Sequence, residues 1–390
     1  MEQLKDFLNS RKKTETLRRL VPLVRLGRGR IRLAAEPDSP VLLDFSSNDY
    51  LALTEHPAVI TASRKYLEKI GAGAGAARLM SGDLDLHHQL ESKVAELKGK
   101  EAALIFGSGY LANAGVIPAL VGRGDAIFSD RLNHASIYDG CRLAGARLFR
   151  FHHNDLDHLE KLLRENRAGF RRAIIVVESL YSMDGDRCPL NDLVALKKRH
   201  DCLLMVDEAH ATGIFGENGG GVIEEDGVGP DVDIAMGTFG KALGSYGAYI
   251  ASSRDMALYL VNRARTFIYS TALPPAVIGA SLAALDIIRT EPSLRRELRA
   301  NVNIFQDRLL QEGLIEKAGP SQIVPVIIGP SSRAVEIAGR LREKGVYATA
   351  VRPPTVPEGT ARLRFSITRH HTHADLEETV RALMQTIIPK

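Results

Sequence analysis

The chain has 390 residues, a length that suits one large domain and a smaller one. With 45% hydrophobic and 25% charged residues, its composition is typical of a soluble globular protein and excludes a disordered or fibrous chain. The formal net charge of +4 is small for this length, which argues against a dedicated nucleic-acid-binding protein.

The cysteines and the hydropathy indicate the compartment. Cys141, Cys188 and Cys202 are odd in number and form no CxxC pair, so we expect a reduced protein without a disulfide or metal framework. The first twenty residues carry charges throughout, and no run approaches about 18 uninterrupted apolar residues. We therefore expect a cytoplasmic protein with no membrane partner.

From the amino terminus to about Leu33, helical spacing of apolar residues predicts an amphipathic helix followed by a basic connector, with Leu4, Phe7, Leu8, Leu17 and Leu20 on that spacing. Short apolar runs then alternate with helical patterns. These runs are residues 102–107, 126–130, 147–151, 173–179, 203–208, 233–238 and 247–252. Such an alternation predicts an α/β fold whose mostly parallel central sheet is flanked by helices on both faces.

The carboxyl-terminal part begins with one long helical stretch, expected from about Pro275 to Leu310. Two shorter strands and two helices follow, which is typical of a small α/β domain. We expect an amino-terminal helix and connector over residues 1–50, a large domain over 51–290 and a small domain over 291–390.

Two motifs have simple structural explanations. GAGAGA, residues 71–76, fits the spacing of a dinucleotide fingerprint, but a helical pattern precedes it rather than a strand, so we expect a flexible loop. His370, His371 and His373 lie close together without a cysteine or carboxylate cluster to complete a metal site. We expect them to be the solvated flank of the following helix, and we expect no metal.

Polar residues end several predicted strands, and ligands of parallel sheets bind at those ends. Asp207 lies near the end of one strand, His210 follows it, and Lys241 comes one strand later within TFGKALGSYGA. Taken singly, such groups are more often caps than catalysts. Together they match pyridoxal phosphate, which needs an amine for its aldehyde and a carboxylate for its pyridinium nitrogen. The glycines around Lys241 are expected to leave room for the ring.

Three further features suit the same cofactor. The stretch FGSGYLANAG turns from a strand into a helix at Ser108 and Gly109, and helix N-termini bind phosphate. An ordinary strand-to-helix turn is the alternative. Thr238 could contact the phosphate, and His134, just past a strand end, could stack on the ring.

These motifs resemble the α-oxoamine synthases, a family of fold-type I pyridoxal-phosphate enzymes. They follow the family order along nearly the whole chain, as LDFSSNDYLAL, GSGYLAN, DRLNHASIYDG, VVESLYSMDGD, LLMVDEAHATG, TFGKALG, FIYSTALPP and RPPTVPEGTARLRFS. The resemblance implies a fold-type I transferase that works as a homodimer with active sites shared between its subunits.

The resemblance also implies roles for single residues. Lys241 would be the Schiff-base lysine, Asp207 the pyridinium partner and His134 the stacking imidazole, with His210 completing the catalytic set. The other cofactor contacts would be Ser108, Gly109, Tyr110, Glu178, Ser182 and Thr238, with Ser270 and Thr271 from the other subunit. For substrate, Arg364 would bind the amino-acid carboxylate near Asn48. Arg18, or else Arg19, and Thr355 would contact the acyl group.

The segments DFSSNDYL and RPPTVP followed by ARLRFS are most similar to the family member that condenses L-alanine with a pimeloyl thioester in biotin synthesis. The thioester would be pimeloyl-CoA or a pimeloyl carrier protein. Other members, namely 2-amino-3-ketobutyrate CoA ligase, 5-aminolevulinate synthase and serine palmitoyltransferase-like enzymes, are alternatives with the same chemistry. A protein that keeps the fold without catalysis is a further alternative, although Lys241, Asp207 and Arg364 are all present. We expect no nucleic-acid partner.

Overall fold

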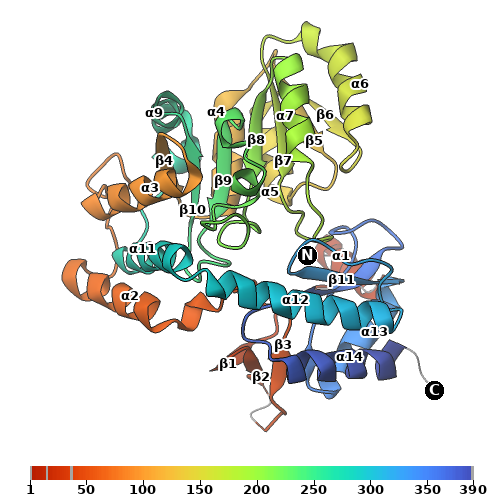
Figure 1. Ribbon diagram of the computed structural model, residues 1–390. Coiled ribbons are helices and arrows are strands. Elements are labelled where there is room, and N and C mark those ends of the chain that lie inside the picture. Colours follow the sequence, from red (N-terminus) through yellow and green to blue (C-terminus); the bar gives the residue numbers. More distant parts are fainter. Residues whose placement is uncertain (1, 15, 36–37, 388–390) are drawn as a thin grey trace. The chain divides into compact units, whose positions relative to one another are not determined.

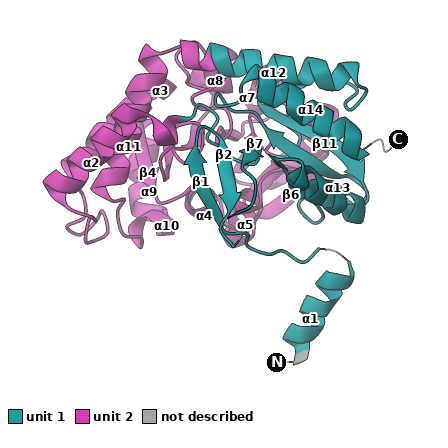
Figure 2. Ribbon diagram, turned by 90° about the horizontal axis from the view of Figure 1, so that it is seen from below, with its two compact units in different colours: residues 1–52, 183–185, 296–390 teal, residues 53–182, 186–295 magenta. Residues whose placement is uncertain are grey.

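The computed structural model describes residues 2–14, 16–35 and 38–387 (Figure 1). The chain forms two compact units (Figure 2). Unit 1 comprises Met1–Ala52, Met183–Gly185 and Arg296–Lys390, and unit 2 comprises Leu53–Ser182 and Asp186–Arg295. The amino-terminal residues therefore belong to the same unit as the carboxyl-terminal ones. Among the helices of the described residues, none is long and apolar enough to cross a membrane.

Unit 2 is built on a seven-stranded sheet of order β4-β10-β9-β8-β7-β5-β6. Its strands are β4 (Ala102–Phe106), β5 (Ala126–Asp130), β6 (Arg147–Phe151), β7 (Ala173–Glu178), β8 (Leu203–Asp207), β9 (Ile234–Thr238) and β10 (Ala248–Ser252). Strand β10 pairs antiparallel with both neighbours, and the pairings from β9 to β6 are parallel. The predicted mostly parallel sheet is confirmed. Every residue of β5, β7 and β10 is buried, which explains their nearly continuous apolar sequences.

Helices flank this sheet. They are η1 (Leu53–Glu55), α2 (Pro57–Ile70), α3 (Asp85–Lys98), α4 (Gly109–Leu120), α5 (Ala135–Ala144), α6 (Leu156–Asn166), η2 (Arg167–Gly169), α7 (Leu190–Arg199), α8 (Val222–Glu225), η3 (Gly229–Asp231), α9 (Arg254–Arg263), α10 (Arg265–Ile268) and α11 (Pro275–Thr290). Helix α4 packs on α5, and α2 packs along α11. The single helix expected from Pro275 to Leu310 is wrong. The helix stops before Pro292, because a residue that precedes proline disfavours helical backbone, and α12 (Ser293–Gln311) begins after it.

Among the described residues, unit 1 contains two small sheets, most of α12 and three further helices (Figure 2). One sheet has the order β1 (Leu23–Gly27), β2 (Arg30–Leu33), β3 (Leu42–Asp44) and β12 (Val346–Tyr347), and the other β11 (Ile323–Gly329), β14 (Ala361–Ser366) and β13 (Thr349–Val351). The helices are α1 (Glu2–Lys13), α13 (Ser331–Glu343) and α14 (His373–Ile387).

The basic connector predicted near the amino terminus is a β-hairpin instead. Strands β1 and β2 pair antiparallel, and the chain reverses where Gly27, Arg28 and Gly29 have φ values of 84°, 50° and 67°. Two glycines allow this left-handed turn at little steric cost. Leu17 and Leu20 therefore lie outside α1, which ends at Lys13.

An ion pair in the interior of unit 2 joins α3 to the end of β8. The side chains of Lys98 and Glu208 are 1% and 0% exposed, and Lys98 Nζ lies 2.7 Å from Glu208 Oε2. Lys98 also donates to Thr212 Oγ1 at 3.0 Å and to the Gly220 carbonyl, while Glu208 Oε1 accepts from Ile223 N at 2.9 Å. These hydrogen bonds offset the cost of removing both charges from water.

We expect Lys98→Met to lower the free energy of unfolding by about 3–5 kcal/mol, because Glu208 would then be a buried charge without its cation. Urea-induced unfolding followed by circular dichroism measures this loss. Lys93→Met is the matched control on the same helix, since the Lys93–Asp286 pair is 37% and 50% exposed. It should cost less than about 1 kcal/mol. Equal losses in the two variants would contradict this interpretation.

His371 is buried in unit 1, so the expected solvated histidine flank is wrong at this position. The residue is 2% exposed, and its ring stacks on Phe45 with centroids 4.0 Å apart. Its Nδ1 accepts from Thr368 N at 3.1 Å, which leaves the proton on Nε2 to donate to the Asp44 carbonyl at 3.1 Å. Burial lowers the pKa of His371 to about 4.

This lowered pKa predicts a pH dependence of stability. Between pH 6.5 and about 4 the unfolded chain binds a proton at His371 that the folded chain does not, so stability is present above pH 6.5 and is lost as the pH falls. His371→Asn stays neutral over this range. We expect its unfolding midpoint to fall less steeply than that of the wild type from pH 7 to pH 4, measured by thermal circular dichroism. Identical slopes would rule out this role for His371.

Candidate active site

Four of the predicted residues lie where parallel strands of unit 2 end. Glu178, Asp207 and Thr238 are the last residues of β7, β8 and β9, and His134 precedes α5 after β5. The register of the sheet places Glu178 directly beside Asp207. This is the edge at which parallel sheets bind ligands.

The turn after β9 presents Lys241 to His210. Lys241 Nζ lies 2.9 Å from His210 Nε2, and His210 is buried while Lys241 is partly exposed. Thr238 Oγ1 donates to the Gly247 carbonyl at 2.8 Å and accepts from Gly240 N at 3.2 Å, so its hydroxyl braces this turn. The contact of Thr238 with a phosphate stays a prediction.

Two of the glycines near Lys241 are required by the fold itself, which differs from the expectation that they leave room for a ring. Gly244 has φ +60°, and a Cβ there would lie 2.5 Å from Thr54 N. Gly247 has φ +100°, and a Cβ there would lie 2.8 Å from a methyl carbon of Leu273. A Cβ at Gly240 would lie 3.6 Å from its nearest atoms, which is an ordinary contact distance. Of these three glycines, only Gly240 therefore has space for a side chain.

A chain of hydrogen bonds joins Asp207 to His134 through two residues that the sequence analysis missed. Asn113 Nδ2 donates to Asp207 Oδ2 and to Ser136 Oγ, both at 2.9 Å. Ser136 Oγ lies 2.8 Å from His134 Nδ1, and Asp207 Oδ1 accepts from Ala209 N at 2.9 Å. One signal pointed to Asn113, because it is an amide within an otherwise apolar stretch of α4 and is 0% exposed.

Glu178 holds the backbone of His134. Its Oε1 accepts from His134 N at 2.5 Å, and the residue is 3% exposed. Burial, together with the neighbouring charge of Asp207, raises the pKa of Glu178 well above its ordinary range. Two adjacent carboxyl groups ionise together only at a high cost, so this environment favours a protonated Glu178 beside Asp207.

The strand-to-helix turn at Ser108 supplies backbone donors. Ser108 Oγ caps α4 by accepting from Leu111 N at 3.2 Å. The first N–H groups of a helix, here at Gly109 and Tyr110, have no acceptor within the helix and favour an anion. The Tyr110 hydroxyl itself donates to the Asp139 carboxylate.

The remaining residues of unit 2 that were predicted to contact the cofactor lie in loops. Ser182 is buried after β7. Ser270 and Thr271 follow α10 and line a cavity of about 20 Å³ with Arg78 and His87. Their contact with a phosphate of another subunit stays a prediction.

The predicted substrate residues belong to unit 1, where they form two groups. Arg364 is 8% exposed and donates to Asn48 Oδ1 at 3.2 Å, to Ser366 Oγ at 2.6 Å and to the Tyr50 hydroxyl at 3.3 Å. These three partners are uncharged. Separately, Arg18 donates to Thr355 Oγ1 at 3.0 Å, which brings together the two residues predicted for the acyl group.

Comparison with known proteins identifies the family. Residues 40–383 match the model of the family "Aminotransferase class I and II". The 8-amino-7-oxononanoate synthase of Geobacter sulfurreducens is 50% identical over 354 residues, which cover 90% of each chain. The chain belongs to the α-oxoamine synthases.

Solved structures agree with this assignment. A serine palmitoyltransferase from S. paucimobilis, with bound PLP–myriocin, matches with 29% identity and a TM-score of 0.90 over 98% of this chain and 96% of that one. An 8-amino-7-oxononanoate synthase from Francisella tularensis matches with 28% identity and a TM-score of 0.77 over 88% of this chain and 97% of that one. The predicted fold-type I architecture and pyridoxal phosphate cofactor of an α-oxoamine synthase are confirmed.

The residues at the sheet edge fit this cofactor. They offer an amine beside an imidazole, a buried carboxylate, a second imidazole and the N-terminus of α4. Asp207 Oδ2 accepts from Asn113 and Asp207 Oδ1 accepts from Ala209 N, so both oxygens of this carboxyl group are held in place.

Among the described residues, one group of three side chains is close enough together to suit a metal ion, and it is distant in the sequence from the side chains above. It consists of His152, Asp155 and His158. Asp155 Oδ1 accepts from His158 N at 2.8 Å as the cap of α6, and His158 Nδ1 accepts from His152 N at 3.0 Å. The local fold therefore already uses these polar atoms, and we assign no metal here.

We expect Asn113→Ala to weaken cofactor binding and to lower kcat by about tenfold or more, because Asp207 and Ser136 would each lose a buried donor. Cofactor affinity is measured by fluorescence titration of the apoenzyme, and kcat by thiol release. Asn262→Ala removes an exposed amide of α9 and should change neither. Normal affinity and normal kcat in the Asn113 variant would show that this link is dispensable.

Proposed function

We propose that this chain catalyses the 8-amino-7-oxononanoate synthase reaction, the condensation of L-alanine with a pimeloyl thioester that releases CO₂ and the free thiol in biotin biosynthesis. The observation that carries the proposal is the 50% identity over 90% of the chain to the relative with this activity in its name. The other family members share the chemistry and differ in substrates.

When bound, pyridoxal phosphate supplies an aldehyde for amines and a cationic ring that stabilises the carbanion left by loss of a proton or of CO₂. Lys241 would hold the aldehyde, Asp207 the pyridinium nitrogen and His134 the ring face. Ser182 and His210 would lie near the phenolic oxygen. The phosphate would be held by Ser108, Gly109, Tyr110 and Thr238, with Ser270 and Thr271 from the partner subunit.

Lys241 is the proposed base. Its Nζ would take the α-proton of the bound alanine, and His210 Nε2, 2.9 Å away, would orient the amine for this transfer. The hydrogen bonds from Asn113 and from Ala209 N would hold the carboxyl group of Asp207 in one orientation. Glu178 fixes the backbone of His134 and so would hold its ring in place.

Arg364 is the proposed receptor for the alanine carboxylate, with Asn48 beside it. Its hydrogen bonds to Asn48, Tyr50 and Ser366 orient the guanidinium through uncharged partners. Arg362, two residues earlier in β14, forms an ion pair with Asp184. A charge-assisted bond to a substrate carboxylate suits a guanidinium held in a fixed orientation, as that of Arg364 is.

The remaining proposals concern partners and compartment. Arg18 and Thr355, which hydrogen-bond each other, would contact the acyl group of pimeloyl-CoA or of a pimeloyl carrier protein. We propose a cytoplasmic homodimer whose active sites are shared between subunits.

The test is a substrate matrix. Thiol release is measured with alanine, glycine and serine against acetyl, pimeloyl and palmitoyl thioesters, and the pimeloyl group is offered on both CoA and a carrier protein. We expect alanine with a pimeloyl thioester to give the highest kcat/KM, because a pocket shaped for one acyl length and one side chain loses contacts with others.

Lys241→Ala is the control for chemistry. It should abolish turnover and the visible absorbance of the bound cofactor, because no other amine would hold the aldehyde. If glycine with acetyl-CoA or serine with palmitoyl-CoA were the best pair, the chain would be a different member of the family. Wild-type turnover in the Lys241 variant would refute the assigned chemistry.

A further inference from the structure

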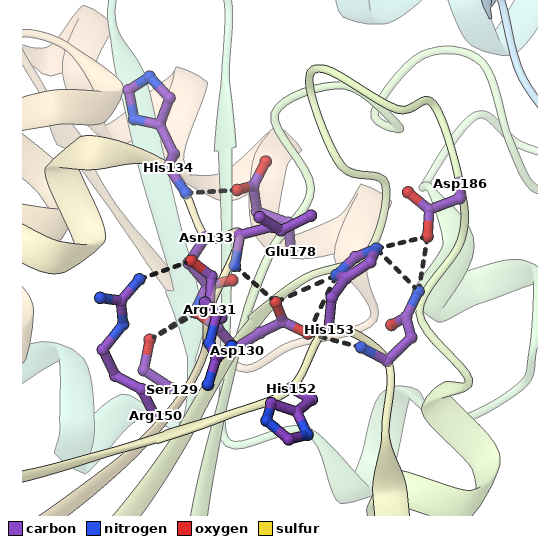
Figure 3. A network of polar contacts seen from close by, with 12 residues as sticks. Ser129, Asp130, Arg131, Asn133, His134, Arg150, His152, His153, Glu178 and Asp186 are labelled. Atoms are coloured by element: carbon purple, nitrogen blue, oxygen red, sulfur yellow. Dashed lines mark hydrogen bonds and ion pairs between the residues drawn. The ribbon is translucent and has the colours of Figure 1, made fainter. Parts of the chain in front are cut away.

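His153 has no role in the mechanism above, yet it lies between two carboxylates of unit 2 (Figure 3). Its Nδ1 is 3.1 and 3.2 Å from the two oxygens of Asp130, and its Nε2 is 2.7 Å from Asp186 Oδ2. Its ring lies perpendicular to that of Tyr181, with centroids 4.3 Å apart. A ring with a carboxylate at each nitrogen donates from both, which requires the charged imidazolium.

The charge balance supports this form. Burial alone would lower the pKa of His153, but the hydrogen bonds and charges of Asp130 and Asp186 raise it to about 10. The Asp130 side chain is 0% exposed, so its charge needs a cation nearby. His153 supplies this cation and also separates two carboxylates that would repel each other.

Asp130 is the centre of the turn that leads to His134. Its Oδ1 accepts from Leu132 N at 2.8 Å, and its backbone carbonyl accepts from Asn133 N at 3.3 Å. Its Oδ2 accepts from Asn154 N at 2.9 Å, beside His153. The turn between β5 and α5 therefore folds around the carboxylate of Asp130, which His153 contacts.

Asp186 belongs to the segment that returns to the sheet after β7. Its carbonyl accepts from Tyr181 N at 3.0 Å, next to Ser182, and Leu180 forms a bridge with Arg187. Asn154 Nδ2 donates to Asp186 Oδ2 at 2.7 Å, in parallel with His153. The same imidazolium thus contacts the segment that carries Ser182.

We propose that His153 is a positioning residue, whose imidazolium ties together the carboxyl ends of β6, β5 and β7 and thereby fixes the cofactor-facing residues His134 and Ser182. The inference rests on the proposed function, which gives those two residues their task. Strand β6 lies at the edge of the sheet, so its backbone pairs with β5 alone. Side-chain contacts such as those of His153 therefore have to fix its carboxyl end.

The test compares variants of the holoenzyme. His153→Gln keeps one N–H donor group, but it removes the positive charge and the ability to bind Asp130 and Asp186 at the same time. We expect kcat to fall about 10- to 100-fold, since small misplacements of reacting groups have effects of this size. Both KM values should stay within about twofold, because His153 contacts no proposed substrate residue. Hydrogen–deuterium exchange should become faster at the amides of Leu132, His134 and Asn154.

Two further variants sharpen the result. His152→Gln is the matched control, because His152 is the adjacent residue and its side chain is 53% exposed. It should leave kcat and exchange unchanged. Asp186→Asn keeps the pair of His153 with Asp130 and removes the second carboxylate, so we expect a smaller fall in kcat with faster exchange at Asn154. This variant carries the test if His153→Gln does not fold.

The role of His153 would be overturned if kcat stayed within twofold of the wild type or if exchange at Leu132 and His134 were unchanged. It would also be overturned if both KM values rose with the fall in kcat, since that pattern indicates a general loss of structure. Wild-type enzyme in the same assays separates the two hypotheses. An inactive wild type would count against the proposed function, whereas an active wild type with an equally active variant would count against His153 alone.

Discussion

The constraint on which this site depends is the burial of several acidic side chains at one edge of a sheet. Four acidic residues lie at or just after the carboxyl ends of three neighbouring strands, and each is at most 5% exposed. They are Asp130 at the end of β5, Glu178 at the end of β7, Asp207 at the end of β8 and Glu208 directly after it. Parallel strands direct their carboxyl ends to the same edge, so the fold itself brings these acids together. Each acid therefore needs its own means of compensation.

The four means of compensation differ, and each fixes a different element. Glu208 is neutralised by Lys98, which anchors the end of α3. Asp207 accepts hydrogen bonds from Asn113 of α4 and from a backbone N–H of its own turn. Asp130 has the imidazolium that follows β6, and burial favours the neutral form of Glu178. Of these acids, Asp207 is thus the one proposed to direct its charge at a cofactor.

The sequence predicted the parts of this structure that depend on local pattern. Fully buried strands are nearly continuous apolar runs, and a lysine between glycines one strand after Asp207 indicated the cofactor. Asn113, Ser136 and His153 were missed because their importance comes from partners far along the chain. Gly244 and Gly247 were misread because their role depends on atoms of Thr54 and Leu273. The hairpin at residues 23–33 has too few residues to show a strand period.

The division of the chain into units has a consequence for its synthesis. All residues of unit 2 have been made once residue 295 has been added to the chain. At that moment unit 1 has only residues 1–52 and 183–185. Strand β3 then still lacks β12, its parallel partner from almost the other end of the chain. Until residues 346–347 have been made, β3 therefore has one edge without its strand partner, and an unpaired edge of this kind is a template for pairing with another chain.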